Sequence, residues 1–224
     1  MCFDLSFYKG KKVLITGHTG FKGSWMSVML VNAGAEVVGY SLEPDNEPSL
    51  FELCGVKDQI TSIVGDIRDL DHLSNVFEEY RPEIVIHMAA QPIVRTGYKD
   101  PVMTYSTNVM GTVNVLECIR LNKFVRSFVN VTTDKVYDNK EDDKAFIEDD
   151  PLDGYDPYSN SKSCSELVTH SYRKSFFEDD KTAISTARAG NVIGGGDFAA
   201  DRIIPDCVRA AVSCKDIVVR MLIP

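Results

Sequence analysis

The sequence predicts an α/β fold: a Rossmann-like, doubly wound parallel sheet with helices on both faces. Two observations carry this prediction. Short apolar runs alternate along the chain with longer stretches of helical spacing, as in the β–α units that build a parallel sheet. The first run, residues 13–15, leads through a turn of spaced glycines into an apolar helical stretch over residues 24–33, which ends at Gly34, a residue type common just after a helix.

The composition is that of a globular protein with one good core. The chain has 224 residues, of which 44% are hydrophobic and 25% charged. Its net charge of −9 argues against nucleic acid as the main partner, and no apolar run approaches the length of a membrane span. Residues 1–12 contain no apolar signal core, so we expect a cytoplasmic protein. Six cysteines without CxxC pairs and four histidines without ligand spacing predict no metal site.

The spaced glycines suit a dinucleotide. A strand, a glycine turn and a helix N-terminus together present backbone N–H groups to a pyrophosphate. Gly17 would make the tight turn, Gly20 would let the ligand approach, and Gly23 would allow close packing of helix on strand. Thr19 and Phe21 lie inside the same turn and are assigned to the same cofactor site. The spacing is GxxGxxG instead of the commoner GxGxxG, and the alternative is an ordinary β–α turn.

The end of the second strand bears on the choice of cofactor. This strand is predicted over residues 35–40. In dinucleotide-binding folds, an acid at this strand end holds the adenosine ribose. Ser41 occupies about that place, and Glu43 follows two residues later. We therefore assign Ser41 to the cofactor and leave both NAD and NADP open, while the lack of an arginine just after the strand favours NAD.

Two further strand ends are predicted to line the same cofactor. The third strand is followed by Asp66 and Ile67, and Asp66 can either bond the adenine amino group or serve as a turn residue. The fourth strand, within residues 83–90, ends in Ala89 and Ala90. Their small side chains would let a flat cofactor lie close to the backbone.

The remaining elements continue the alternation of strand and helix. They are a helix over 71–80 capped by Asp69, a helix over 101–122 interrupted by Asn108 and Gly111, a strand over 127–131, an acidic loop over 138–156, a helix over 158–177, a strand over 182–187 and a helix over 205–212. Gly111 is expected to have a packing reason, and His87 in the fourth strand is interpreted as a packing residue. The long helices 101–122 and 157–177 are candidates for a dimer face as well as for simple sheet cover, and we expect a homodimer or higher homo-oligomer.

Two short motifs carry the predicted chemistry. Tyr158 and Lys162 form a YxxxK, in which the lysine lies one helical turn from the phenol. A tyrosine with a pKa of about 10 is a poor base at neutral pH, and a neighbouring positive charge favours its phenolate. The pair, assigned also to the cofactor site, could take a proton from a sugar hydroxyl while hydride leaves for nicotinamide. Thr133, Asp134 and Lys135 follow a strand end and add a hydroxyl, an acid and a base; the alternative is a turn with two solvated charges.

The motifs together resemble the extended short-chain dehydrogenase/reductase family and, within it, the CDP-glucose 4,6-dehydratases. The segments that carry the resemblance are TGHTGFKGSW (16–25), GDIRD (65–69), HMAAQPIVR (87–95), TNVMGT (107–112), VTTDKVY (131–137), DPYSNSK (156–162) and ARAGNVIGGGD (187–197). The GFKGSW continuation and GNVIGGGD are the most specific of them. Related nucleotide-sugar dehydratases usually carry Thr-Asp-Glu where this chain has a lysine at position 135, and that lysine separates the CDP-glucose group from the dTDP-glucose group.

The resemblance implies a reaction and roles for the motif residues. Tyr158, assisted by Lys162 and Thr133, would deprotonate the glucose 4-hydroxyl as hydride passes from C4 to NAD⁺. Water would then be lost across C5 and C6, with Asp134 as the acid toward the 6-hydroxyl and Lys135 near the base for C5. Hydride would return to C6, so that CDP-glucose becomes CDP-4-keto-6-deoxyglucose with no net use of the cofactor.

The resemblance also implies a domain division and contacts with the nucleotide sugar. We expect residues 1–193 to form an NAD(P)-binding Rossmann domain and residues 194–224 to begin the nucleotide-sugar-binding region. Arg95, Asn191 and Arg202 are the candidate substrate contacts. Family members continue beyond the point where this chain stops, so we expect the C-terminal substrate domain to be largely missing, and the activity of the short chain stays open.

Two other functions remain open at this stage. One is an NAD(P)-dependent nucleotide-sugar epimerase or reductase, but neither reaction needs the dehydration pair Asp134 and Lys135. The other is a non-catalytic dinucleotide-binding domain, which the short C-terminal part favours.

Overall fold

The computed structural model describes residues 4–140 and 145–218, and its centre is a parallel sheet. The six strands of the described part lie in the order β3-β2-β1-β4-β5-β6. They are β1 (Lys12–Thr16), β2 (Glu36–Ser41), β3 (Thr61–Val64), β4 (Ile84–His87), β5 (Ser127–Val131) and β6 (Ala183–Ala187). The predicted doubly wound Rossmann-like fold is confirmed, and the order reverses between β1 and β4, where such sheets open a crevice for ligands.

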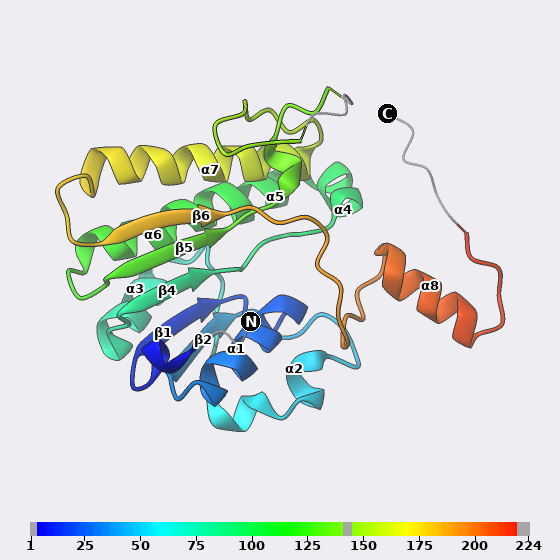
Figure 1. Ribbon diagram of the computed structural model, residues 1–224, viewed down its shortest axis with the longest axis horizontal. Helices are drawn as coiled ribbons and strands as arrows, with labels where there is room; N and C mark the ends of the chain where they lie inside the picture. Colours follow the sequence, from blue (N-terminus) through cyan, green and yellow to red (C-terminus); the bar gives the residue numbers. More distant parts are fainter. Residues whose placement is uncertain (1–3, 141–144, 219–224) are drawn as a thin grey trace.

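Helices cover both faces of this sheet (Figure 1). They are α1 (Phe21–Asn32), α2 (Leu50–Leu53), α3 (Leu70–Tyr80), α4 (Val94–Lys99), α5 (Pro101–Tyr105), α6 (Gly111–Leu121), α7 (Pro157–Phe176) and α8 (Ile203–Val212). Figure 1 shows α6 and α7 on one side of the sheet, α1 on the other, and α8 standing away from it. Among the described residues, no helix is long and apolar enough to span a membrane.

The two core layers follow from the alternation of side chains along β1. Val13 and Ile15 point to one face, where they pack with Leu30 of α1. Leu14 points to the other face and packs with Phe77 of α3 and with residues of α6. A strand that is apolar on both faces is what a sheet covered by helices on both sides requires.

The long helix predicted over residues 101–122 is interrupted as expected. α5 and α6 are joined by a π-helical turn over Ser106–Met110. Asn108 in this turn is buried and bonds the backbone of Gln91 in both directions, with N···O distances of 2.8 and 3.1 Å. A Cβ on Gly111 would lie 2.4 Å from Cδ1 of Ile67, so the glycine has the packing reason that the sequence predicts.

Several boundaries differ from the predicted ones. α1 begins at Phe21 instead of Ser24, because Gly20 is already the extended N-cap and Gly23 is tolerated inside the first turn. α4 was not predicted, because six residues are too few to show helical periodicity. Of the acidic loop, residues 141–144 lie outside the described residues. Among the described acids, Glu148, Asp149 and Asp153 are exposed, and Asp138 and Asp150 are partly buried.

Candidate active site

The glycine turn joins β1 to α1 at the crevice. Gly17 has φ of +76° and makes the predicted tight turn, and a Cβ there would lie 2.7 Å from the Ala89 nitrogen. Gly23 packs against the turn itself, since its Cβ would lie 2.1 Å from the carbonyl oxygen of Gly17. Gly20 is exposed and is the N-cap of α1. Without a side chain at this position, a ligand can come close to the backbone N–H groups of the first helical turn. The turn therefore offers backbone N–H groups and a helix N-terminus, which together favour binding of an anionic group.

Two hydroxyls predicted to hold the cofactor meet beside the turn. The Thr19 hydroxyl donates to the carbonyl oxygen of Leu42 at 2.9 Å, and its oxygen lies 2.9 Å from the Ser41 hydroxyl. The structure thus brings Thr19 and Ser41 together, although Ser41 ends a strand that is distant in sequence. Ala89 lies directly behind the turn, where its N–H bonds the Thr16 hydroxyl at 3.2 Å.

Asp66 uses its side chain locally. Both carboxylate oxygens accept from Nε of Arg68, at 3.0 and 2.9 Å, and one also accepts from the Arg68 amide at 2.9 Å. The hydrogen bonds from Arg68 hold the pKa of the Asp66 carboxyl below its usual range. The turn interpretation is therefore realised in the structure. Ile67, beside it, is buried against Gly111.

His87 is a buried residue of β4 whose side chain lies within hydrogen-bonding distance of one residue of β1 and one of α6. Its Nδ1 lies 2.7 Å from the Thr16 hydroxyl and its Nε2 lies 3.2 Å from the Thr112 hydroxyl. Burial, with the nearby charge of Lys162, lowers the pKa of His87 to about 3. The residue stays neutral at physiological pH, which confirms its interpretation as a packing residue.

Tyr158 and Lys162 lie on successive turns of α7 and face the end of β5. Asp156 caps the helix by accepting from the amides of Tyr158 and Ser159 at 2.9 and 3.1 Å. The Thr133 side chain, just beyond β5, lies near enough to the Tyr158 phenol to influence its pKa. The ammonium group of Lys162 is buried and donates to the carbonyl oxygen of Val131 at 3.0 Å. Tyrosine, lysine and threonine therefore converge as the sequence predicts.

The electrostatics of the pair differ from the sequence expectation. Burial raises the pKa of the Tyr158 phenol above its ordinary value; the neighbouring Thr133 side chain and the charge of Arg202 oppose it only in part. Burial, with the charge of Lys22, lowers the pKa of Lys162 to about 8. Lys162 is not among the groups that shift the pKa of Tyr158 here, and its ammonium group donates to the carbonyl of Val131.

Asp134 and Lys135 are exposed at the same strand end. The Thr133 hydroxyl lies 3.0 Å from Asp134 Oδ1, which ties the acid to the group that meets Tyr158. On the far side, a Cβ on Gly190 would lie 3.5 Å from the other carboxylate oxygen of Asp134. The acid therefore stands between the tyrosine and the segment that follows β6.

Lys22 is a residue of the site that sequence reasoning did not single out. It lies in the first turn of α1 and forms no ion pair with any residue the structure describes. Burial, with the charge of Arg202, lowers the pKa of Lys22, and Lys22 in turn lowers the pKa of Lys162. Three cations thus surround the crevice and attract an anion. The signal was the lysine of GFKGSW, which lies directly before the third glycine of the turn.

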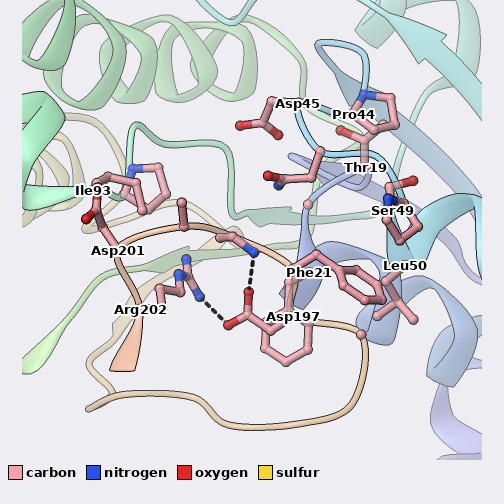
Figure 2. Close-up of a pocket in the computed structure, with 18 of the residues that line it drawn as sticks. Thr19, Phe21, Pro44, Asp45, Ser49, Leu50, Ile93, Asp197, Asp201 and Arg202 are labelled. Carbon is pink, nitrogen blue, oxygen red and sulfur yellow. Dashed lines mark hydrogen bonds and ion pairs between the residues drawn. The ribbon is translucent and has the colours of Figure 1, made fainter. Parts of the chain in front are cut away.

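A cavity of about 290 Å³ lies between the glycine turn and the 194–202 segment (Figure 2). Its walls include Thr19, Phe21, Ile93, Asp197 and Arg202. The segment is held against α1, since Trp25 Nε1 of this helix donates to the Gly195 carbonyl at 3.0 Å.

The predicted substrate residues are placed unequally around this cavity. Arg202 lines it and pairs with Asp197 at 3.1 Å. Arg95 pairs at 2.7 Å with Asp201, which also lines the cavity. Asn191 is exposed and does not line it. The structure therefore places Arg202 in the cavity wall, holds Arg95 next to it through Asp201, and leaves Asn191 outside.

Comparison with known proteins gives a consistent family. A family model described as GDP-mannose 4,6 dehydratase matches residues 14–218. A CDP-glucose 4,6-dehydratase from Salmonella typhimurium is 50% identical over 222 residues, which is 97% of this chain and 62% of that protein.

Two solved structures share the fold. A dTDP-glucose 4,6-dehydratase from Streptomyces venezuelae, solved with NAD bound, has a TM-score of 0.78 at 26% identity and covers 91% of this chain and 62% of its own. An epimerase from Methanothermobacter thermautotrophicus has a TM-score of 0.80 at 27% identity, with coverage of 96% and 62%. The chain thus spans about 62% of the length of these proteins.

His87 predicts how stability depends on pH. The folded protein binds this proton only near a pKa of about 3, whereas the unfolded chain binds it near 6.5. Between these values the unfolded state holds more protons, so the free energy of unfolding falls as the pH drops, by about 1.4 kcal/mol per pH unit from this residue. Urea denaturation between pH 6.5 and 4.5 should show this slope reduced in His87→Gln. His170→Gln, at an exposed position of α7, should keep the parental slope, and an unchanged slope in His87→Gln would contradict the assignment.

Proposed function

The chain belongs to the GDP-mannose 4,6-dehydratase family, within the extended short-chain dehydrogenases/reductases, and we propose that it converts CDP-glucose to CDP-4-keto-6-deoxyglucose with NAD. The observation that carries this proposal is the strand end where Thr133 meets Tyr158 and where an acid and a lysine, Asp134 and Lys135, follow at once. The 50% identical relative from Salmonella typhimurium supports CDP-glucose as the substrate.

The cofactor fits the open side of the glycine turn. We assign the pyrophosphate to the exposed backbone of Gly20 and the N-terminus of α1, where Lys22 is the nearby cation without an ion pair among the described residues. The adjoining hydroxyls of Thr19 and Ser41 suit the uncharged ribose of NAD. When bound, NAD supplies the acceptor for the C4 hydride and returns that hydride to C6.

The other residues predicted to bind the cofactor are proposed to contact it here as well. The members that line the turn and the neighbouring strand ends are Gly17, Phe21, Gly23, Asp66, Ile67, Ala89 and Ala90. Ala89 has the firmest support, because it lies directly behind Gly17 and any side chain on that glycine would collide with it.

The first proton transfer belongs to Tyr158. Its oxygen, beside Thr133, would accept the proton of the sugar 4-hydroxyl as the C4 hydride leaves. Because burial raises the pKa of this phenol, the phenolate needs positive charge when it forms. Lys162, one turn away, can supply it by turning from the carbonyl of Val131.

Water loss belongs to the next two residues. The 4-keto group acidifies the C5 hydrogen, and Lys135 is proposed to take it as Asp134 gives a proton to the departing 6-hydroxyl, which leaves as water. Lys135 is exposed, so a sugar bound beside it would displace water from its amino group. Return of hydride to C6 and of a proton to C5 completes the balance. An epimerase or reductase would not need this acid–base pair.

The nucleotide sugar is proposed to lie beneath the 194–202 segment. Its diphosphate would replace Asp197 and Asp201 as the partner of Arg202 and Arg95. Asn191 would approach from the segment after β6. In this division, residues 1–193 form the cofactor domain and residues 194–224 begin the sugar-nucleotide region.

The assembly and the location are proposed from surface features. The cysteines that the structure describes are unpaired, which supports the reducing cytoplasm. Apolar side chains are exposed at Val102 of α5, at Met110 of the π-helical turn and at Leu167 of α7. They support a homodimer or higher homo-oligomer through these helices.

Light scattering should give a multiple of the monomer mass for the parent and the monomer mass for Leu167→Glu. A parent that is monomeric at micromolar concentration would overturn the assembly.

Tyr158→Phe should abolish turnover of CDP-glucose. Removal of a positioned acid–base group costs about 10²–10⁴-fold in rate. The measurement is formation of the 4-keto-6-deoxy product, with Tyr155→Phe, at a strongly exposed position, as the matched control that keeps parental activity. Product at the parental rate from Tyr158→Phe would rule out its role, while protection of the parent against heat by NAD without any product would leave a binding domain only.

Asp134→Asn should separate oxidation from dehydration. An amide cannot protonate the 6-hydroxyl, so the product should disappear, while the hydrogen at C5 should still exchange with deuterium from the solvent. Mass spectrometry of the recovered CDP-glucose measures this exchange. Lys135→Met should lose both product and exchange. Exchange that persists in Lys135→Met would remove that lysine as the C5 base.

A further inference from the structure

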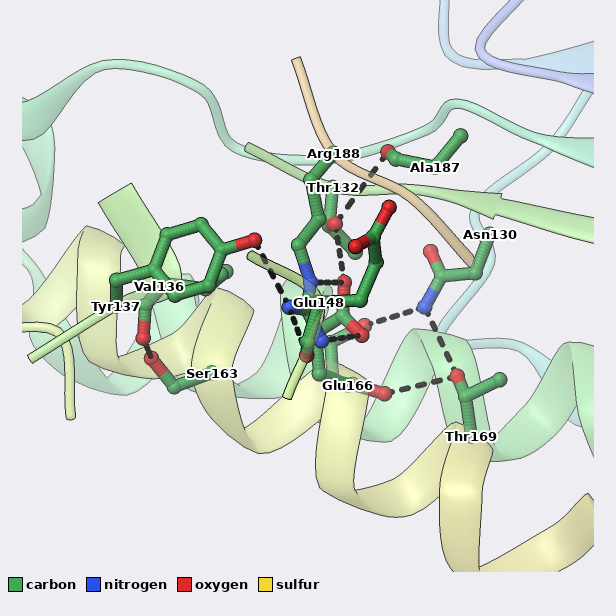
Figure 3. Close-up of polar contacts among 11 residues, drawn as sticks. Asn130, Thr132, Val136, Tyr137, Glu148, Ser163, Glu166, Thr169, Ala187 and Arg188 are labelled. Carbon is green, nitrogen blue, oxygen red and sulfur yellow. Dashed lines mark hydrogen bonds and ion pairs between the residues drawn. The ribbon is translucent and has the colours of Figure 1, made fainter. Parts of the chain in front are cut away.

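Glu166 is a buried acid of α7 that the proposed reaction does not use. Its carboxylate accepts from Nε and Nη2 of Arg188 at 3.1 Å each, and the Thr132 hydroxyl also donates to it (Figure 3). The side chain of Glu166 is only 4% exposed and that of Arg188 17%. A paired arrangement of this kind satisfies a charge that would otherwise be costly inside the protein.

The acid lies one turn beyond Lys162, and this spacing has a consequence for the strand. Tyr158 meets Thr133, Lys162 meets the carbonyl of Val131, and Glu166 meets Thr132. Three successive turns of α7 therefore hold three consecutive residues at the end of β5. A shift of one residue in either element would break all of these contacts together.

Arg188 also contacts the chain just after residues 133–135. Its Nη1 donates to the Tyr137 hydroxyl at 3.1 Å and to the Glu148 carbonyl at 2.9 Å, and the guanidinium lies 5.0 Å from the centre of the Tyr137 ring. Tyr137 follows Lys135 by two residues. The backbone on either side of Arg188 also bonds the segment, since the amides of Thr132 and Asp134 donate to the carbonyls of Ala187 and Ala189.

We propose that Glu166 and Arg188 are a positioning pair, which acts through the Thr132 hydroxyl to keep residues 133–135 in register with Tyr158. The chemistry that this register serves rests on the proposed function, whereas the register itself is a property of the folded chain. A buried ion pair contributes little certain stability, so its use here is geometric. A misplacement of about 1 Å in a reacting group can cost about 10²-fold in rate.

Thr132→Val is the variant that tests the proposal most cleanly. It removes the hydrogen bond from the Thr132 hydroxyl to Glu166 and keeps the ion pair between Glu166 and Arg188. Glu166→Gln, in contrast, would leave the buried charge of Arg188 without its partner. Thr169→Val is the matched control: Thr169 is a buried threonine of α7 whose hydroxyl accepts from Asn130 at 3.0 Å and donates to the Ser165 carbonyl at 2.8 Å (Figure 3). Its hydrogen bonds in the described part of the chain do not include Glu166. Thr132→Ser restores the hydroxyl.

The readout is the ¹³Cζ signal of Tyr158 in tyrosine-labelled protein without substrate, assigned by Tyr158→Phe. Thr133→Val gives the reference position of a phenol that has lost its partner. Thr132→Val should move the signal toward that reference, Thr132→Ser should return it, and Thr169→Val should leave it in place. In turnover, kcat of Thr132→Val should fall by about 10–10²-fold with KM little changed.

Two results would overturn the proposal. One is a parental Tyr158 signal in Thr132→Val when Thr133→Val has moved it, and the other is an equal movement in Thr169→Val. Arg188→Lys, which keeps the charge and loses the two-pronged contact, gives the same test if Thr132→Val does not fold. Because the signal needs no substrate, a parent chain without product would contradict the proposed function and leave this test intact.

Discussion

The register between α7 and the carboxyl end of β5 is the constraint on which the candidate site depends. The phenol, the ammonium group and the carboxylate of α7 each meet a different residue of one short strand end. A parallel sheet delivers that end to the crevice, and the Asp156 cap fixes where the helix starts relative to it. The chemistry of the site is therefore a consequence of how one helix lies on one strand.

The second feature of the site is a group of neighbouring cations at the crevice of an acidic protein. Lys22, Lys162 and Arg202 influence one another there, although the chain as a whole carries a net charge of −9. Arg202 and Arg95 are satisfied by aspartates of the 194–202 segment. Ligands with phosphate groups are what such a site attracts, and the segment that supplies the aspartates is the part that must yield to them.

The sequence predicted the parts of this site that are encoded by local spacing. The apolar runs gave the strands, the glycine spacing gave the tight turn at Gly17, and the broken periodicity at Asn108 and Gly111 marked the π-helical turn. It did not predict contacts that only the fold brings together. Glu166 and Arg188 are separated by a helix and a strand, so no local pattern joins them. The raised pKa of Tyr158 was missed for the same reason, since burial depends on the whole crevice.

The measurement that tests the account most directly is the fate of the C4 hydrogen. CDP-glucose carrying deuterium at C4 is incubated with the chain and NAD in ordinary water, and the product is analysed by NMR. Transfer of one hydride from C4 to C6 predicts deuterium at C6 of the 4-keto-6-deoxy sugar and none at C4. Deuterium that stays at C4 of an epimer, or a product whose C6 carries only solvent hydrogen, would contradict it.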